Sequence, residues 1–138
     1  MASKTYLDVN VFIYWLTDSY EFGENAYRWI KQIEEKPQQY TTSSLTIYET
    51  SIIIAGQIGK SLNDTSLINQ INTAFSDLIN LEIIPLTAKH LIEAPVLMKE
   101  FNLDFEDAIH LNAALDNDAT QIVSNDRDFD KTPLTRLF

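Results

Sequence analysis

The feature of this sequence that most constrains its fold is a regular alternation between short extended stretches and longer segments of helical periodicity. Stretches typical of buried strands occur at residues 6–9, 40–42, 81–85 and 121–124, with a further one at 135–138. The segments between them carry apolar residues three and four positions apart, and only three glycines and four prolines interrupt the chain. Strands that alternate with helices form a parallel sheet with helices on both faces. The sequence therefore predicts an α/β fold with a mostly parallel sheet.

Capping residues indicate where the helices begin. Ser, Thr, Asp and Asn side chains can accept a hydrogen bond from the first backbone N–H groups of a helix, and they precede most of the periodic segments. One segment contains Pro95, which lacks a backbone N–H group, and we expect the helix to kink or break there. The helices are expected to begin near Asn10, at Asn25, at Ser43 or Ser44, within residues 63–66, after Thr87 and at Asp104.

The organisation of the chain predicts one domain over residues 1–138, because no linker, repeat or low-complexity stretch divides it. Apolar runs such as residues 11–16 and 52–55 are far shorter than the roughly 20 residues that span a bilayer. Cysteine is absent, which excludes disulfides, thiolate metal sites and cysteine nucleophiles. We expect a cytoplasmic protein without a membrane segment.

The charge of the chain is strongly acidic, with 20 Asp and Glu residues against 10 Lys and Arg residues and a formal net charge of −10. This balance argues against tight binding of nucleic acid through a broad basic surface. The acids are concentrated between residues 102 and 130, where Arg127 stands alone as a Lys or Arg residue. A nucleic acid would have to approach this region through bound cations.

Four carboxylates are expected to meet at one edge of the sheet. Asp8 ends the first predicted strand, and Asp126 comes just after the strand that ends at Ser124. The carboxyl ends of parallel strands share one edge, and ligands bind outside that edge in open α/β sheets. Glu49 and Asp107 can join the two aspartates from helices that begin at the same edge.

Carboxylates that are crowded together without Lys or Arg repel one another, and this repulsion raises their pKa values. A hard divalent cation relieves the repulsion, and Mg²⁺ prefers oxygen ligands such as carboxylate, amide and water. A cation held in this way can activate water and stabilise the charge that develops on a phosphodiester. The chemistry that fits is metal-assisted hydrolysis of a phosphate ester.

Each of these residues also has a structural interpretation when it is taken alone. Glu49 lies among apolar helix residues, so its carboxylate either points outward or is held inside for a purpose. Asp104 fits a helix N-cap and Asp128 fits a turn. His110 fits a packed or surface histidine better than a metal ligand, and the sequence offers no partner for His90. Only the joint arrangement of the acids favours a site.

Four short motifs follow one another along the chain, namely YLDVNV at 6–11, SSLTIYE at 43–49, DFEDAIH at 104–110 and SNDRDF at 124–129. In this order and spacing they resemble the PIN-domain ribonucleases, and the resemblance covers essentially the whole chain. It implies a three-layer α/β/α sandwich with a central, mostly parallel sheet of four or five strands. It also implies an acidic Mg²⁺ or Mn²⁺ site and endonucleolytic cleavage of single-stranded or loop RNA.

The resemblance assigns the acidic quartet, expected to be both catalytic and metal-binding, to Asp8, Glu49, Asp107 and Asp126. Asp128 is a second candidate for the last position, because some members place their final acid directly before Phe. The other matched positions are Asn10, which would orient a ligand or water, the small hydroxyl residues Ser43 and Ser124, and Asp104, an extra acid without an assigned role.

The size of the chain resembles that of the VapC-type toxins of toxin–antitoxin pairs. Such toxins are usually homodimers and are silenced by a small antitoxin, so the resemblance implies an RNA substrate, a second copy of the chain and an antitoxin as partners.

Two other functions remain open at this stage. A PIN-like scaffold would act by binding a partner protein and would not need the metal. An aspartyl-phosphate phosphatase would use Asp8 as its nucleophile, but it needs a second acid at position 10 and a dedicated lysine. Asn10 cannot exchange a proton, and Lys89 is the one loosely suitable lysine.

Overall fold

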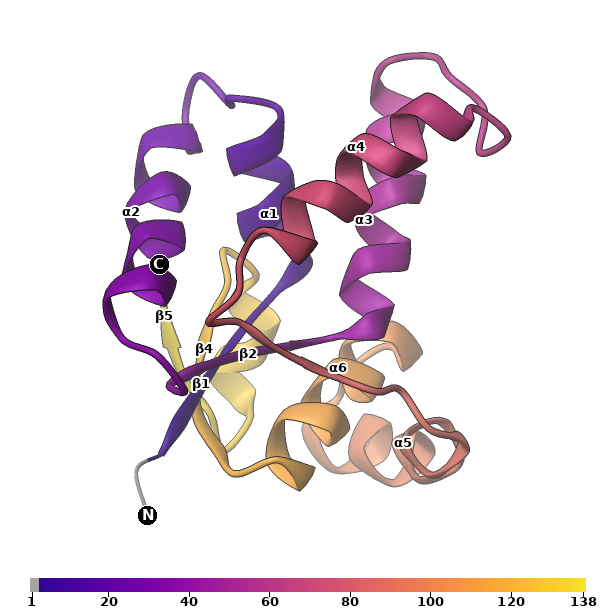
Figure 1. Ribbon diagram of the computed structural model, residues 1–138. Helices are drawn as coiled ribbons and strands as arrows, with labels where there is room; N and C mark the ends of the chain where they lie inside the picture. Colours follow the sequence, from indigo (N-terminus) through magenta and orange to yellow (C-terminus); the bar gives the residue numbers. More distant parts are fainter. Residues whose placement is uncertain (1–2) are drawn as a thin grey trace.

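The alternation of strands and helices along the chain produces a parallel sheet between two layers of helices (Figure 1). The computed structural model describes residues 3–138. Its five strands lie in the order β3-β2-β1-β4-β5, and each neighbouring pair is parallel. All five carboxyl ends therefore share one edge. The strands are β1 (Lys4–Leu7), β2 (Tyr40–Ser43), β3 (Glu82–Ile84), β4 (Ala119–Val123) and β5 (Thr135–Leu137).

The first helical layer contains the helices from the first half of the chain, drawn in indigo to magenta in Figure 1. Its core includes Leu7 of β1 and the rings of Phe12 and Phe75, whose centroids are 4.7 Å apart and whose planes are tilted by 41°. Burial of these apolar side chains supplies the main driving force that attaches the layer to the sheet. The helices are α1 (Val9–Leu16), α2 (Gly23–Glu35), α3 (Ser44–Gln57) and α4 (Thr65–Ser76).

The second layer is formed by α5 (Ala88–Phe101) and α6 (Phe105–Asp116), which cover the other face. Tyr6 belongs to this second core, whereas its neighbour Leu7 belongs to the first. Successive side chains of a strand point to opposite faces, so β1 contributes to both cores. The three-layer α/β/α sandwich and the five-stranded parallel sheet confirm the predicted fold class.

Three α-helices begin at an aspartate whose carboxylate accepts a backbone hydrogen bond. Asp8 accepts from Val9 N at 2.8 Å, Asp64 from Leu67 N at 3.0 Å and Asp104 from the third residue of α6 at 2.8 Å. The expected N-cap at Asp104 is therefore confirmed. Asp8 both follows β1 and caps α1, so its backbone position is fixed by two elements.

Two local predictions were wrong. The first strand ends at Leu7 and Val9 already belongs to α1, so the strand-to-helix turn lies at Asp8, before Asn10. Of the two effects expected of Pro95, a kink or a break, the break is wrong, because α5 runs on to Phe101. Pro95 is exposed, so water can bond the carbonyl group that the missing N–H leaves free.

The other expected elements are present within a few residues of their predicted bounds, and the turn expected at 125–129 includes the start of a short 3₁₀ helix, η1 (Arg127–Lys131). Ser43 occupies the N-cap position of α3, but its side chain makes no capping hydrogen bond. None of the helices formed by residues 3–138 has the length and apolar character needed to cross a membrane.

Candidate active site

The four predicted carboxylates line one small pocket at the carboxyl edge of the sheet. Asp8 comes from the β1–α1 turn, Glu49 from the middle of α3, Asp107 from the first turn of α6, and Asp126 from the loop between β4 and η1. The pocket has a volume of about 140 Å³. Its other lining residues are Val9, Asn10, Ile53, Glu106 and His110.

The carboxylate of Asp8 is buried and held on both oxygens. Oδ1 accepts from Val9 N at 2.8 Å, and Oδ2 accepts from Ser124 Oγ at 2.6 Å, with the Asn10 amide at 3.4 Å. The same Ser124 oxygen accepts from the backbone N–H of Asp126 at 3.0 Å. Burial raises the pKa of Asp8 above its usual value. Asn10 and Ser124 thus contact the acids, as their predicted supporting roles require.

Glu49 points inward and is 5% exposed, which excludes the alternative of a solvated helix residue. Its Oε1 is bonded to Nε2 of His110, which is equally buried and belongs to α6. Burial opposes the charged form of His110, but the contact with Tyr6 and the carboxylates of Glu49 and Asp8 outweigh it, so the pKa of the imidazole lies well above its usual value. His110 is therefore the packed histidine that the sequence favoured.

Asp107 is half-buried at the centre of the acidic group. Burial raises the pKa of its carboxyl to about 7, and the charges of Asp104, Asp126 and Asp8 add to the effect. No Lys or Arg from residues 3–138 lines the pocket to offset these charges. The ionised group is therefore unfavourable in the protein alone.

Asp126 and Asp128, the two candidates for the fourth acid, differ in their position relative to the pocket. Carboxylate oxygens of Asp107, Asp126 and Asp128 all lie within 4.8 Å of one another, so both candidates reach Asp107. Only Asp126 lines the pocket, whereas Asp128 is exposed and has Lys131 3.6 Å away. Asp126 is the inner residue and Asp128 stands at the rim.

Two other predicted residues take part indirectly. Asp104 contacts the site through its capping bond to Asp107 N and through its charge. Ser43 bonds to Tyr6 and is not a lining residue. Sequence reasoning did not assign Glu106 to the site, although it also lines the pocket. Its position beside Asp107 in the DFED motif was the available signal.

Comparison of the sequence with models of known protein families identifies the family of this chain. The family model of the PIN domain matches residues 5–134. The chain belongs to the PIN domain family. A search of curated proteins found no match.

Solved structures with the same fold include several toxins. The sarcin–ricin loop cleaving toxin VapC20 of Mycobacterium tuberculosis has a TM-score of 0.71 at 15% identity, over 92% of this chain and 93% of that one. VapBC2 of Rickettsia felis, bound to a promoter DNA fragment, has a TM-score of 0.66 at 17% identity over 96% of both chains. A toxin–antitoxin complex of Klebsiella pneumoniae has a TM-score of 0.62 at 20% identity, over 96% of this chain and 99% of that one. At these identities the likeness shows the fold.

The donors of this PIN domain fit a hard divalent cation. The polar groups that line the pocket are carboxylate and amide oxygens with one imidazole, and the chain has no cysteine. Burial raises the pKa of both Asp8 and Asp107, and neighbouring acids add to the effect at Asp107, so further positive charge would favour the ionised carboxylates. Mg²⁺ or Mn²⁺ would supply that charge and accept these ligands.

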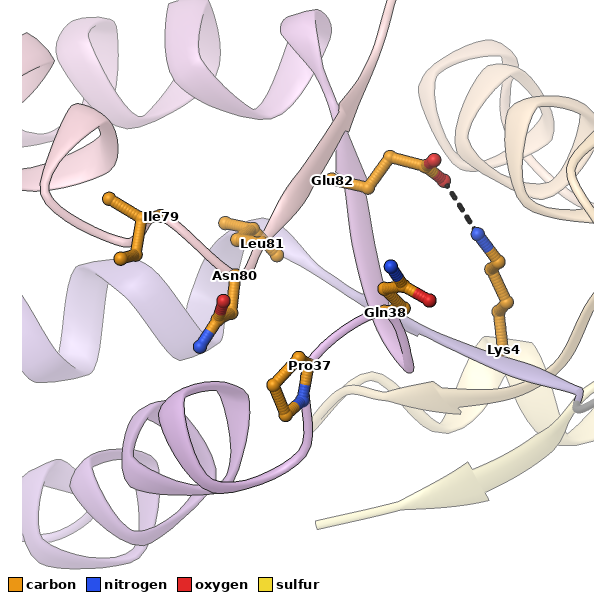
Figure 2. A pocket seen from close by; sticks show the side chains of 7 residues that line it. All are labelled: Lys4, Pro37, Gln38, Ile79, Asn80, Leu81 and Glu82. Atoms are coloured by element: carbon orange, nitrogen blue, oxygen red, sulfur yellow. Dashed lines mark hydrogen bonds and ion pairs between the residues drawn. The ribbon is translucent and has the colours of Figure 1, made fainter.

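A larger hollow lies at the opposite, amino edge of the sheet and has a different character (Figure 2). Its volume is about 570 Å³, and the Lys4 ammonium among its lining residues pairs with Glu82 at 3.2 Å (Figure 2). The remaining side chains there are Pro37, Gln38, Ile79, Asn80 and Leu81. This hollow brings together no group of acids, so the smaller acidic pocket is the candidate active site.

Proposed function

We propose that this PIN domain is a metal-dependent endoribonuclease that hydrolyses phosphodiester bonds of RNA, with Asp8, Glu49, Asp107 and Asp126 as catalytic residues that hold Mg²⁺ or Mn²⁺. The observation that carries the proposal is the convergence of these carboxylates, from four separate elements, in a pocket that no Lys or Arg of residues 3–138 lines. Such an arrangement is unfavourable in the protein alone and becomes favourable with a divalent cation.

The residues of the site divide the work. Ser124 and the backbone N–H of Val9 fix both oxygens of Asp8, and the Asn10 amide lies beside them. Ser124 also accepts the backbone N–H of Asp126, so one hydroxyl contacts both proposed ligands that follow β1 and β4. A bound divalent cation would supply an activated water and stabilise the charge that develops on the phosphate. Asp128 at the rim is a further candidate ligand.

The acidity of the chain sets the condition for RNA binding. With a net charge of −10, the protein repels RNA unless cations neutralise the mouth of the pocket. We therefore expect RNA to bind weakly without divalent metal and to bind through the cations when they are present.

We further propose that the protein is the toxin of a toxin–antitoxin pair, acting in the cytoplasm as a homodimer and silenced by a small antitoxin. The toxin and toxin–antitoxin structures with the same fold support this role. The acidic pocket also suits an inhibitory segment that bears Arg or Lys. A basic peptide should then compete with Mn²⁺ for the pocket, and a small DNA-binding protein should be encoded in the adjacent reading frame.

Cleavage of total RNA by the purified protein tests the main proposal. We expect cleavage with Mg²⁺ or Mn²⁺ that is lost on adding EDTA and in the Asp8→Asn variant. Asp64→Asn is the matched control, because Asp64 caps α4 as Asp8 caps α1 and asparagine is an equally good cap. Cleavage that survives EDTA or Asp8→Asn would overturn the proposal.

The two alternatives predict other results. If calorimetry detects no binding of Mg²⁺ or Mn²⁺ and RNA stays intact, the protein is a binding scaffold. The phosphatase alternative needs a lysine beside Asp8, but Lys89 pairs with Asp116 at 3.1 Å and lies outside the pocket lining. The structure therefore offers this alternative no support.

A further inference from the structure

A chain of buried hydrogen bonds lies behind the acidic pocket and ends on one of its carboxylates. The Tyr6 hydroxyl lies 2.9 Å from Ser43 Oγ and 2.7 Å from Nδ1 of His110. The opposite ring nitrogen of His110, Nε2, bonds to Oε1 of Glu49. Each of these four side chains is at most 5% exposed. They lie on four different elements, with Ser43 on β2, Tyr6 on β1, His110 on α6 and Glu49 on α3.

The sequence places these residues directly behind the acids. Tyr6 lies on β1, and Asp8 directly follows the end of that strand, two residues after Tyr6. His110 follows Asp107 by three residues on α6 and lies on the same side of the helix. The chain of hydrogen bonds thus joins the elements that carry Asp8, Asp107 and Glu49.

The donors and acceptors in this chain of hydrogen bonds determine how the His110 ring is oriented. An ionised carboxylate accepts only, so Nε2 of His110 carries a proton toward Glu49. Nδ1 either accepts from the Tyr6 hydroxyl or donates to it, because Tyr6 and Ser43 hydroxyls can reverse their direction. The imidazole is bonded at both ends in either case, and rotation of the ring would break both bonds.

Only one oxygen of Glu49 is used in this way. Oε2 makes no hydrogen bond with residues 3–138, and it is not among the atoms that are both buried and unbonded. Glu49 lines the pocket, so Oε2 is the oxygen left available there. A carboxylate with one oxygen bonded to a fixed donor presents the other in a defined direction.

We infer that His110 is a positioning residue, which holds the Glu49 carboxylate so that Oε2 faces the metal, and that Tyr6, itself bonded to Ser43, holds the His110 ring for this purpose. The inference rests on the proposed metal-dependent function and adds to it residues that act through Glu49. Partners of metal ligands of this kind typically contribute about 10- to 100-fold to metal affinity.

Titration of Mn²⁺ by calorimetry tests the inference on folded protein. We expect His110→Leu to weaken Mn²⁺ binding by about 10-fold or more, and Tyr6→Phe, which removes one hydroxyl only, to weaken it several-fold. His110→Gln should recover part of the loss, because its amide can donate to Glu49. His90→Gln is the matched control, since His90 is an equally buried histidine outside the pocket lining, and it should bind Mn²⁺ as the wild type does.

A second measurement needs no metal. The chain has two histidines, so ¹⁵N-histidine labelling gives two rings, and His90→Gln identifies the signals of His110. We expect Tyr6→Phe to shift Nδ1 of His110 and Glu49→Gln to shift Nε2 in EDTA. Unshifted signals in both variants would show that the hydrogen bonds do not form.

The outcomes separate this inference from the proposed function. Wild-type protein that binds no Mn²⁺ would overturn the proposed function, whatever the histidine signals show. Wild-type protein that binds Mn²⁺, with folded Tyr6→Phe and His110→Gln variants that bind it equally well, would overturn the positioning role alone. Tyr6→Phe keeps the test decisive if His110→Leu fails to fold.

Discussion

Two buried histidines on adjacent helices make the same type of contact in different surroundings. His90 of α5 bonds through Nε2 to Asp116 of α6 at 3.1 Å, and His110 of α6 bonds through Nε2 to Glu49 of α3. Both rings are almost completely buried. Nδ1 of His90 accepts a hydrogen bond from the backbone N–H of Thr87 at 3.1 Å, and this bond helps to cap the N-terminus of α5.

The difference lies in what surrounds the carboxylate. Asp116 is partly exposed and also pairs with Lys89, and the hydrogen bonds from Lys89 and His90 lower the pKa of its carboxyl. Glu49 is buried near Asp8, and no Lys or Arg of the described chain lines that pocket. Lys89, His90 and Asp116 form a group that joins two helices, whereas the Glu49–His110 pair lies in a pocket whose lining holds more carboxylates than cationic groups. Under the proposed function, the first pair contributes to stability and the second contributes to the site.

The largest expected effect is a difference in RNA cleavage between variants of Glu49 and Asp116, the carboxylates that bond to the two histidines. Glu49→Gln should lower Mn²⁺-dependent RNA cleavage by at least about 100-fold, because it removes a ligand charge. Asp116→Asn should leave the cleavage rate unchanged, since its carboxylate lies outside the pocket lining. Both rates are measured on the same RNA at saturating Mn²⁺. If the two variants lost cleavage activity equally, the proposed difference in role between Glu49 and Asp116 would be wrong.

The second effect concerns stability at the other histidine. His90→Ala should lower the free energy of unfolding by about 2 kcal/mol, because it removes the bond to Asp116 and the helix-start bond to Thr87. His90→Gln should regain part of this, since glutamine at the same helix position can form a capping box. Urea unfolding followed by circular dichroism measures both. A variant with wild-type stability would show that the His90 pair is not structural.

The third effect is a gain in stability at the site. Because burial and neighbouring acids raise the pKa of Asp107 to about 7, ionisation of Asp107 destabilises the folded state, fully so above pH 7. In EDTA at pH 8, Asp107→Asn should therefore stabilise the protein by about 1 kcal/mol after allowance for its exposure, and raise Tm by about 3 °C.

The pH dependence and a control sharpen this prediction. The gain should vanish near pH 4, where the folded protein already holds the proton. Glu106→Gln is the matched control, because it removes an exposed acid from the same helical turn, and it should give no gain at either pH. If Asp107→Asn were less stable than the wild type at pH 8, burial and repulsion by the neighbouring acids would not destabilise ionised Asp107.

The smallest effect concerns Asp116. Its pKa is lowered in the folded state, so its contribution to stability is present above its usual pKa and is lost as the pH falls through the folded value. Asp116→Asn should lower stability by about 0.5 kcal/mol at pH 7 and by less at pH 3. Urea unfolding at the two pH values measures the difference. A larger loss at pH 3 than at pH 7 would reverse the sign of the linkage.

The sequence by itself determined the layers of the fold and the order of the acids. Periodicity is a local property, and capping at Asp104 and the position of Asp8 after a strand are read from neighbouring residues. The rule for parallel sheets then brings Asp8 and Asp126 to one edge. The continuation of α5 through Pro95 was not predicted, because the effect of a proline depends on its exposure, which a local pattern does not give.

Only the tertiary structure decided how the acids are held. Glu49 had two open orientations in the sequence, and its inward one depends on His110, which lies 61 residues further along the chain. The partner of His90 lies 26 residues away on another helix, and Tyr6 meets His110 across 104 residues. Hydrogen bonds between distant residues depend on how helices pack on the sheet. The candidate site residues are therefore visible in the sequence, whereas their hydrogen-bond partners appear only once the layers are assembled.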